Sequence, residues 1–139
     1  MRRIVTAAFV SLDGVMQAPG GPEEDPTGGF TLGGWTFHGW DSVMEAAMGE
    51  MFAAPFDLLL GRKTYEIFAA HWPYVAPEDP IGQVFDRATK YVVSRSDPQL
   101  DWQNSVRLGG TAEVAALKQG EGPTLLTQGS SDLIQSLLT

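Results

Sequence analysis

The chain has 139 residues, a mass of 15.0 kDa and a formal net charge of −8. This length fits one domain, residues 1–139, with a real hydrophobic core, and the acidic balance argues against a general nucleic-acid binder, which needs a basic surface. The sequence has no cysteine, which excludes disulfides, thiolate metal sites and a cysteine nucleophile. Its two histidines and its acids show no metal-ligand spacing, so we predict no metal.

The sequence shows neither an apolar run long enough to span a membrane nor the features of a secretory signal peptide. The most apolar run, Leu58–Leu60, is flanked by Asp57 and Arg62 and is far too short to cross a bilayer. Two arginines stand near the N-terminus, but the apolar stretch after them is short, so a secretory signal is not expected. We therefore expect no membrane partner, and the composition is compatible with a cytoplasmic location.

The N-terminal part of the chain predicts a strand, a long loop and a helix. Residues Arg3–Val10 read as a buried strand that ends in an Asp13-Gly14 turn. The Gly- and Pro-rich stretch Gln17–Gly34 predicts a long irregular loop, which is either a functional lid that orders on ligand binding or a disordered insertion. Asp41–Ala54 carries a helical apolar stripe, with Asp41 or Ser42 available as the N-cap.

The remainder of the chain alternates between strand and helix patterns. Leu58–Leu60 reads as a strand, and a helix over Thr64–Ala70 follows it. Further strands are expected at Lys90–Ser94, Ser105–Leu108 and Pro123–Thr127, a loop at Val75–Gly82, and helices at Gln83–Ala88, Ala112–Lys118 and Asp132–Leu138. This alternation predicts an α/β domain with a largely parallel sheet that is covered on both faces.

Three turns in this pattern carry residue types that hold phosphates. Gly61-Arg62-Lys63-Thr64 precedes a helix start, Ser94-Arg95-Ser96 follows an apolar strand, and Gly129-Ser130-Ser131 opens the last helix. Ligands of α/β sheets gather outside the carboxyl ends of the strands, where all three turns are expected. Each turn could also be an ordinary capped turn. The G-x-G-x-x-G fingerprint is absent, which disfavours a Rossmann dinucleotide site.

The order of four motifs resembles a known family. Phe9–Met16 with its Ser-Leu-Asp-Gly, the Gly-Arg-Lys-Thr-Tyr-Glu turn at 61–66, Tyr91–Arg95 and the Gly129-Ser130 helix start occur in one series. This series is similar to the dihydrofolate reductase-like family, which includes the riboflavin-biosynthesis reductase domain. The resemblance implies a three-layer α/β/α domain with a mostly parallel mixed sheet. Gly129-Ser130 stands where the folate enzymes have Gly-Gly, as in the riboflavin-type branch.

The resemblance also implies NADPH as the cofactor and assigns residues to it. Arg62, Lys63 and Thr64 would contact its phosphates, with Arg62 near the adenosine 2′-phosphate. Ser94 and Arg95 would complete that 2′-phosphate site, which selects NADPH over NADH. The remaining cofactor-binding residues implied by the resemblance are Gly129, Ser130 and Ser131 for the pyrophosphate, and the backbone of Ala8 and Val15 for the nicotinamide carboxamide.

The substrate side rests on two carboxylates of the helix expected at 41–54. Folate reductases place a carboxylate on this helix that pairs with the pterin ring, and Glu45 occupies about that position, with Asp41 one turn earlier on the same face. Both could instead be solvent-facing acids that favour the helix dipole. A pterin and a ribosylaminopyrimidine phosphate both stay open as the substrate.

The family usually continues past the last helix with further strands, whereas this chain ends at Leu137-Leu138-Thr139. We therefore expect a domain truncated at its C-terminus, either because the sequence is a fragment or because the protein is naturally shortened. The resemblance also implies a homodimer, because the family's further strands often complete its dimer interface. The leading hypothesis is an NADPH-dependent reductase. A non-catalytic nucleotide- or flavin-binding module with the same fold is the rival, and an unrelated phosphate-binding regulator is a third hypothesis.

Overall fold

The computed structural model describes residues 1–139, which form two compact units. The first, called the sheet unit here, contains Met1–Ala7 and Pro55–Thr139, and the second, called the inserted unit, contains Ala8–Ala54. None of the helices is long and apolar enough to cross a membrane.

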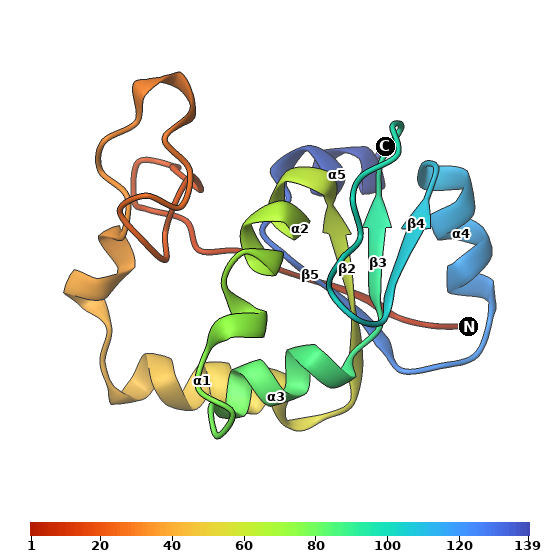
Figure 1. The fold of residues 1–139 in the computed structure, drawn as a ribbon, viewed down its shortest axis with the longest axis horizontal. Helices are drawn as coiled ribbons and strands as arrows, with labels where there is room; N and C mark the ends of the chain where they lie inside the picture. The colour runs from red at the N-terminus through yellow and green to blue at the C-terminus, as the bar shows by residue number, and fades with distance from the viewer. The chain divides into compact units, whose positions relative to one another are not determined.

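The sheet unit is built on five strands that all run parallel, in the spatial order β1-β5-β2-β3-β4. Figure 1 shows the arrows of β2 and β3 pointing the same way. The strands are β1 (Ile4–Ala7), β2 (Phe56–Gly61), β3 (Lys90–Val93), β4 (Ser105–Leu108) and β5 (Thr124–Gln128). The α/β class is confirmed, and the sheet of this chain is entirely parallel.

Helices connect these strands and cover both faces of the sheet. They are α2 (Arg62–Ala69), a 3-10 helix (Trp72–Tyr74), α3 (Pro80–Arg87), α4 (Thr111–Gln119) and α5 (Ser131–Leu137). On one face a buried cluster joins the sheet to α4 and α5, and its members are Leu59, Leu108, Val114, Leu125 and Leu133. The side chains of a strand alternate between faces, so Leu58 and Leu60, which are also fully buried, point to the other face.

Aromatic rings fill the second face, on the side of α2 and α3. Phe85 of α3 meets Phe56 of β2 edge-on, with the ring centroids 6.1 Å apart, and stacks on Phe68 of α2 at 5.8 Å. Trp72 closes the group at 4.9 Å from the Phe85 ring. Aromatic pairs in these geometries stabilise a core beyond the area that they bury, so this cluster holds α2 and α3 against the sheet near the amino end of β2.

A buried ion pair links the N-terminus to β2. Arg2 and Asp57 are in contact, with side chains that are 3% and 13% exposed, and the Arg2 Nε donates to the Pro123 carbonyl at 2.8 Å. The second carboxylate oxygen of Asp57 accepts the Thr89 N–H at 3.1 Å. These contacts satisfy both buried charges, and they tie together the segments in which β1, β2, β3 and β5 begin.

A second buried cation lies where β3 begins. Lys90 is fully buried, and its Nζ donates to the carbonyls of Asp86 at 3.0 Å and Gln103 at 2.9 Å. Its Nζ also lies 4.2 Å from the centroid of the Trp102 ring. Burial lowers the pKa of Lys90 to about 8, and the nearby Asp86 carboxylate opposes part of that shift. A neutral amine can keep both carbonyl bonds, so deprotonation removes mainly the cost of the buried charge.

We expect Lys90 to make the protein more stable as the pH rises from about 8 to about 10. The folded pKa lies below the unfolded value of about 10.4, so in this window the unfolded state binds more protons and the free energy of unfolding rises with pH. Urea unfolding at several pH values measures this as the difference between the unchanged chain and Lys90→Met. Lys118→Met, which removes a cation from a partly buried position on α4, is the control for the loss of one lysine. A Lys90→Met difference that is flat with pH would contradict the expectation.

The inserted unit contains one α-helix, α1 (Ser42–Ala53), and two 3-10 helices, Thr27–Gly29 and Trp35–Gly39. The loop predicted at Gln17–Gly34 is folded on itself by hydrogen bonds. The Gln17 side chain donates to the carbonyls of Asp25 and Thr27 at 2.9 and 2.8 Å, and the Trp35 indole donates to the Gln17 carbonyl at 2.9 Å. Ordering of this loop on ligand binding stays a prediction.

Two predicted elements were wrong in extent. The first strand ends at Ala7 rather than Val10, and the stretch predicted as a loop at Val75–Gly82 already contains the start of α3. The helix begins at Pro80 because Asp79 caps it, accepting the N–H groups of Ile81 and Gly82 at 3.0 and 2.8 Å. Proline suits the first helical position, where its missing N–H leaves no bond unmade.

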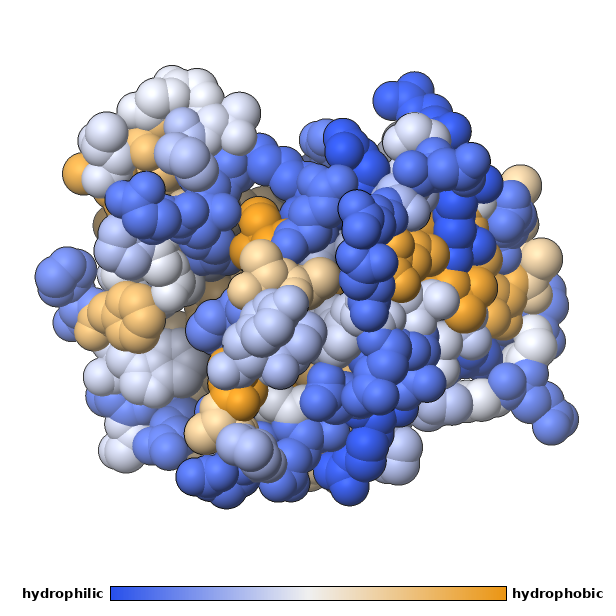
Figure 2. Space-filling view, in the orientation of Figure 1, coloured by the Kyte–Doolittle hydropathy of each residue, from blue (hydrophilic) through white to orange (hydrophobic).

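Hydrophobic residues on the face of the molecule in view form separate patches between hydrophilic ones (Figure 2). Six of the ten large apolar residues that are strongly exposed belong to the inserted unit, namely Val10, Leu12, Leu32, Phe37, Trp40 and Val43. Exposed apolar residues are ordinary when they are scattered. The expectation of a homodimer therefore stays a prediction.

Candidate functional site

The three predicted turns of the sheet unit lie at the carboxyl edge of adjacent strands. Gly61, the last residue of β2, pairs in register with Val93, the last residue of β3. Neighbouring strands lie about 4.8 Å apart, so Arg62 and Ser94 begin adjacent turns. On the other side of β2, the turn after β5 contacts the end of β2, where the Gly61 N–H donates to the Ser130 Oγ at 2.9 Å.

The turn after β5 has an unusual backbone. Gly129 and Ser130 both adopt positive φ, at 68° and 62°. Glycine does this without cost, whereas the left-handed region costs other residues roughly 1–2 kcal/mol. The bond that Ser130 accepts from Gly61 and the Gly129 N–H bond to the Ala7 carbonyl at 2.9 Å hold the turn in this shape. A side-chain carbon added at Gly129 would lie 4.0 Å from Thr64, so the two turns face each other closely.

Arg62 stands on the first turn of α2, whose N-terminus has no side-chain cap. Its guanidinium pairs with Glu66 one turn later, Nη1 to Oε1 at 3.0 Å, and both side chains are about half exposed. An exposed pair of this kind is worth about 0.2–1 kcal/mol and leaves most of the guanidinium N–H groups available. The uncapped N–H groups and the cation together favour an anion at this helix start.

The turn after β3 is buried at Ser94 and exposed at Arg95. The Ser94 N–H donates to the Leu108 carbonyl at 2.9 Å, and its Oγ accepts the Ser96 N–H at 3.2 Å. Arg107 of β4 donates from Nε to the Ser96 carbonyl at 2.8 Å and so fixes the turn from the neighbouring strand. Arg95 is exposed and makes no bond within the chain, which leaves its guanidinium available to a ligand.

Gln128, the last residue of β5, carries a buried acceptor without a donor. Its Oε1 is inaccessible to solvent and makes no hydrogen bond within the chain. Because side chains alternate along a strand, Gln128 shares the face of Leu126, which pairs with Leu58 on the α2 side of the sheet. A buried carbonyl oxygen without a partner is costly, and such groups often mark a place where a ligand donates.

The remaining predicted site residues belong to the inserted unit. The Asp41 carboxylate caps α1 by accepting the N–H groups of Val43 and Met44 at 3.1 and 2.9 Å, while Glu45 is exposed. The Ser11 N–H donates to the Val15 carbonyl, and the Ser11 Oγ accepts the Val15 N–H, both at 2.9 Å. A nicotinamide carboxamide would therefore have to share the Val15 carbonyl with Ser11. The side chain of Asp41 therefore has a structural task, and the roles of Glu45, Ala8 and Val15 stay predictions.

The structure thus gathers one set of predicted residues at a single edge, and these are Arg62, Lys63, Thr64, Ser94, Arg95, Gly129, Ser130 and Ser131. Sequence reasoning missed Glu66, Arg107 and Gln128. Glu66 could have been found from its spacing of four residues from Arg62 on one helix. Gln128 could have been found as a polar residue directly before a glycine turn at the end of an apolar strand. No group of three His, Asp or Glu side chains lies close enough to hold a metal ion.

Comparison with known proteins agrees with these features. The RibD C-terminal domain family matches residues 2–139, which span both units. No curated protein matches the chain. The family match confirms the resemblance that the four motifs indicate. It supports a reductase-like domain of the dihydrofolate reductase type.

Proposed function

The chain belongs to the RibD C-terminal domain family, and we propose that it is an NADPH-dependent reductase of a pterin or a ribosylaminopyrimidine-type substrate. The observation that carries this proposal is the meeting of three phosphate-binding turns at the carboxyl edge of β2, β3 and β5. Their closest link is the hydrogen bond from the Gly61 N–H to the Ser130 Oγ at 2.9 Å.

The donors at this edge fit the phosphates of a dinucleotide. The N–H groups of the first turn of α2 and the side chains of Arg62, Lys63 and Thr64 would hold phosphate oxygens, and Gly129, Ser130 and Ser131 would hold the pyrophosphate. Ser94 and Arg95 would bind the 2′-phosphate. Two guanidinium groups on adjacent turns suit a dianionic phosphate monoester, which NADPH has and NADH lacks.

The unpaired oxygen of Gln128 fits the other end of the cofactor or the substrate ring. A carboxamide NH₂ or a ring N–H would supply the donor that the buried Oε1 lacks. When bound, NADPH supplies a hydride for an electrophilic C=N or C=O carbon. The chain's own contribution is to position the reactants and to place fixed donors at the phosphates.

A direct test combines binding with turnover. We expect the protein to bind NADPH more tightly than NADH in a titration, and to oxidise NADPH with either dihydrofolate or the ribosylaminopyrimidine phosphate of riboflavin synthesis. Equal affinity for NADPH and NADH would contradict the 2′-phosphate site. Turnover with neither substrate, while NADPH binds, would contradict the reductase.

Glu45 separates the two substrate classes. A carboxylate can pair with the amidine-like edge of a pterin through two parallel hydrogen bonds, so Glu45→Gln should lower turnover of a pterin about tenfold or more. With an open ribosyl substrate the reacting carbon lies on the sugar, and the same change should leave turnover nearly unchanged. Steady-state rates with both substrates measure this.

Asp41→Asn is the control for Glu45→Gln, because asparagine keeps the N-cap of α1 while removing the second carboxylate. If Asp41→Asn lowers turnover tenfold while Glu45→Gln leaves it unchanged, then Asp41 and not Glu45 is the carboxylate that pairs with the substrate.

A non-catalytic nucleotide- or flavin-binding module is the second candidate function. The observation that favours it is the state of the two carboxylates, since Asp41 is used by the helix cap and Glu45 is exposed rather than buried in an apolar pocket. A general acid usually needs burial to raise its pKa into a useful range. Nucleotide binding without turnover on any substrate would support this module.

A further inference from the structure

A further cation, Arg107, lies beside the turn that follows β3. Arg107 belongs to β4, the outermost strand on this side of the sheet, and pairs in register with Val92 of β3. Side chains alternate along a strand, so Arg107 shares the face of Val92 and Ser94. Val92 pairs in turn with Leu60, whose side chain faces α2. The row of polar turns after β5, β2 and β3 therefore continues with a guanidinium from β4.

The guanidinium of Arg107 is fixed through one nitrogen. Its Nε donates to the Ser96 carbonyl at 2.8 Å and lies 3.4 Å from the Asp97 Oδ1. Because both contacts use Nε, the N–H groups of the two terminal nitrogens remain available to a ligand. The side chain is 37% exposed, so a ligand can reach these groups from solvent. The bond to Ser96 limits the conformations of the side chain, which lowers the entropy that a ligand contact costs.

The turn that Arg107 holds adds further donors. The Oγ atoms of Ser94 and Ser96 lie 3.2 Å apart, and Arg95 between them is exposed. The Ser94 N–H donates to the Leu108 carbonyl at 2.9 Å, which fixes the turn against β4 a second time. Two guanidinium groups and two hydroxyls thus belong to one turn and the strand beside it, and this donor set suits a phosphate monoester.

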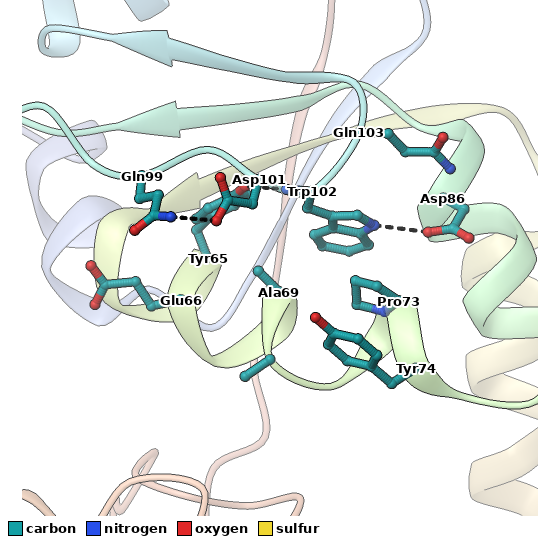
Figure 3. Close-up of a pocket in the computed structure, with 11 residues that line it drawn as sticks. Tyr65, Glu66, Ala69, Pro73, Tyr74, Asp86, Gln99, Asp101, Trp102 and Gln103 are labelled. Carbon is teal, nitrogen blue, oxygen red and sulfur yellow. Dashed lines mark hydrogen bonds between the residues drawn. The ribbon is translucent and has the colours of Figure 1, made fainter.

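The other end of the connection between β3 and β4 does not favour an anion. It is held against α3 by Trp102, whose indole N–H donates to the Asp86 carboxylate at 2.8 Å (Figure 3). The hollow beside it, of about 470 Å³, is lined by acids that include Glu66, Asp86 and Asp101, and by no lysine, arginine or histidine. An anionic ligand at the carboxyl edge is therefore drawn to the Arg107 end of this connection.

We propose that Arg107 is a third arginine of the 2′-phosphate site, that it increases the selectivity for NADPH over NADH, and that Asp97 competes with the phosphate for it. The inference rests on the proposed function, because it adds a specificity-determining residue to the same cofactor site. The terminal nitrogens of Arg107 bind phosphate oxygens while Nε keeps the Ser96 carbonyl. Asp97 is 93% exposed, so its side chain can move aside, but its charge opposes that of the phosphate.

Adenosine 2′,5′-bisphosphate and adenosine 5′-monophosphate are suitable probes, because they differ only in the 2′-phosphate. Calorimetric titration of each into the full chain measures the preference for the 2′-phosphate without any hydride transfer. Arg107→Gln should weaken the bisphosphate about fivefold to tenfold, as the loss of a charge-assisted contact predicts, and change the monophosphate by less than about twofold. Asp97→Asn should tighten the bisphosphate about twofold to fivefold.

Salt separates a direct contact from a purely structural role of Arg107. If Arg107 only held the Ser96 carbonyl, its replacement would distort the turn, and the loss of affinity would persist at high ionic strength. A contact between charges is screened by salt, so we expect the loss in Arg107→Gln to shrink at least about twofold between about 0.05 M and about 0.5 M sodium chloride.

Arg87→Gln is the matched control, because the Nε of this exposed arginine at the end of α3 also donates to a backbone carbonyl, that of Gln83 at 3.2 Å. It should leave the preference unchanged. Equal affinity of the unchanged chain for both probes would contradict the 2′-phosphate site itself and this inference with it. If the preference exists, the inference alone is overturned by an Arg107→Gln variant that keeps it in full, by a loss that salt does not reduce, or by an Asp97→Asn variant that does not bind the bisphosphate more tightly.

Discussion

Replacing Arg62 and Arg95 together by glutamine should weaken NADPH about a hundredfold or more while changing NADH affinity only slightly. Each charge-assisted contact to a phosphate is worth about 1.5–3 kcal/mol, which is roughly tenfold or more per arginine. The structure offers both groups on adjacent turns, since Arg62 follows Gly61 and Arg95 lies two residues after Val93, its register partner. Titration of both nucleotides into both proteins gives the measurement.

The matched control for this double variant removes two other positive charges. Arg87 at the end of α3 is exposed, Lys118 in the last turn of α4 is partly buried, and both lie toward the amino ends of the strands. Arg87→Gln with Lys118→Gln should therefore weaken both nucleotides by the same small factor, through net charge alone. Equal losses of NADPH and NADH in the Arg62 and Arg95 variant would show that these arginines do not bind the 2′-phosphate.

Asp57→Ala should lower the free energy of unfolding by about 3–5 kcal/mol, because it leaves the buried guanidinium of Arg2 without a counter-charge. It also removes the acceptor of the Thr89 N–H. Urea unfolding measures this loss as a lower midpoint with an unchanged slope. A loss of that size would be a large fraction of the stability of a small domain.

Asp97→Ala is the control for burial, because it also takes a carboxylate from an arginine pair. Asp97 lies 3.4 Å from Arg107 and is 93% exposed, so its removal should cost at most about 1 kcal/mol. Replacing Arg2 and Asp57 together by methionine and valine should cost less than Asp57→Ala alone, since no charge is then left buried. Similar losses for Asp57→Ala and Asp97→Ala would contradict the assigned role of the buried pair.

Much of the fold could be predicted because its signals are local. The apolar run at Leu58–Leu60 and the glycine turns after the strands mark each element within a few residues. The start of α3 was missed because Asp79-Pro80 suits a turn as well as a helix start, and only the packing of Phe85 decides between them. The order of the strands depends on long-range pairing and could not be predicted from any local pattern.

In the candidate site, too, local contacts could be predicted from the sequence and long-range contacts could not. Arg62 and Glu66 are one turn apart, so their pairing follows from helix geometry alone. The bond from Gly61 to Ser130 joins residues 69 positions apart, and it exists only because β5 lies beside β2. The unpaired oxygen of Gln128 likewise depends on burial, which no stretch of sequence reveals by itself. Sequence patterns predicted three candidate phosphate-binding turns and could not supply the contacts that orient them.

The position of β5 between β1 and β2 also governs how the chain can assemble during synthesis. Ile4 pairs with Leu125 and Ala7 with Gln128, so β1 has no neighbour in the sheet until residues 124–128 have emerged. At translation rates of about 5–20 residues per second, β1 waits roughly 6–25 s for its partner. During that time one edge of β2 is open as well, while β2, β3 and β4 can already pair. Among these stages, the nascent chain is therefore most vulnerable to misassociation just before β5 is made.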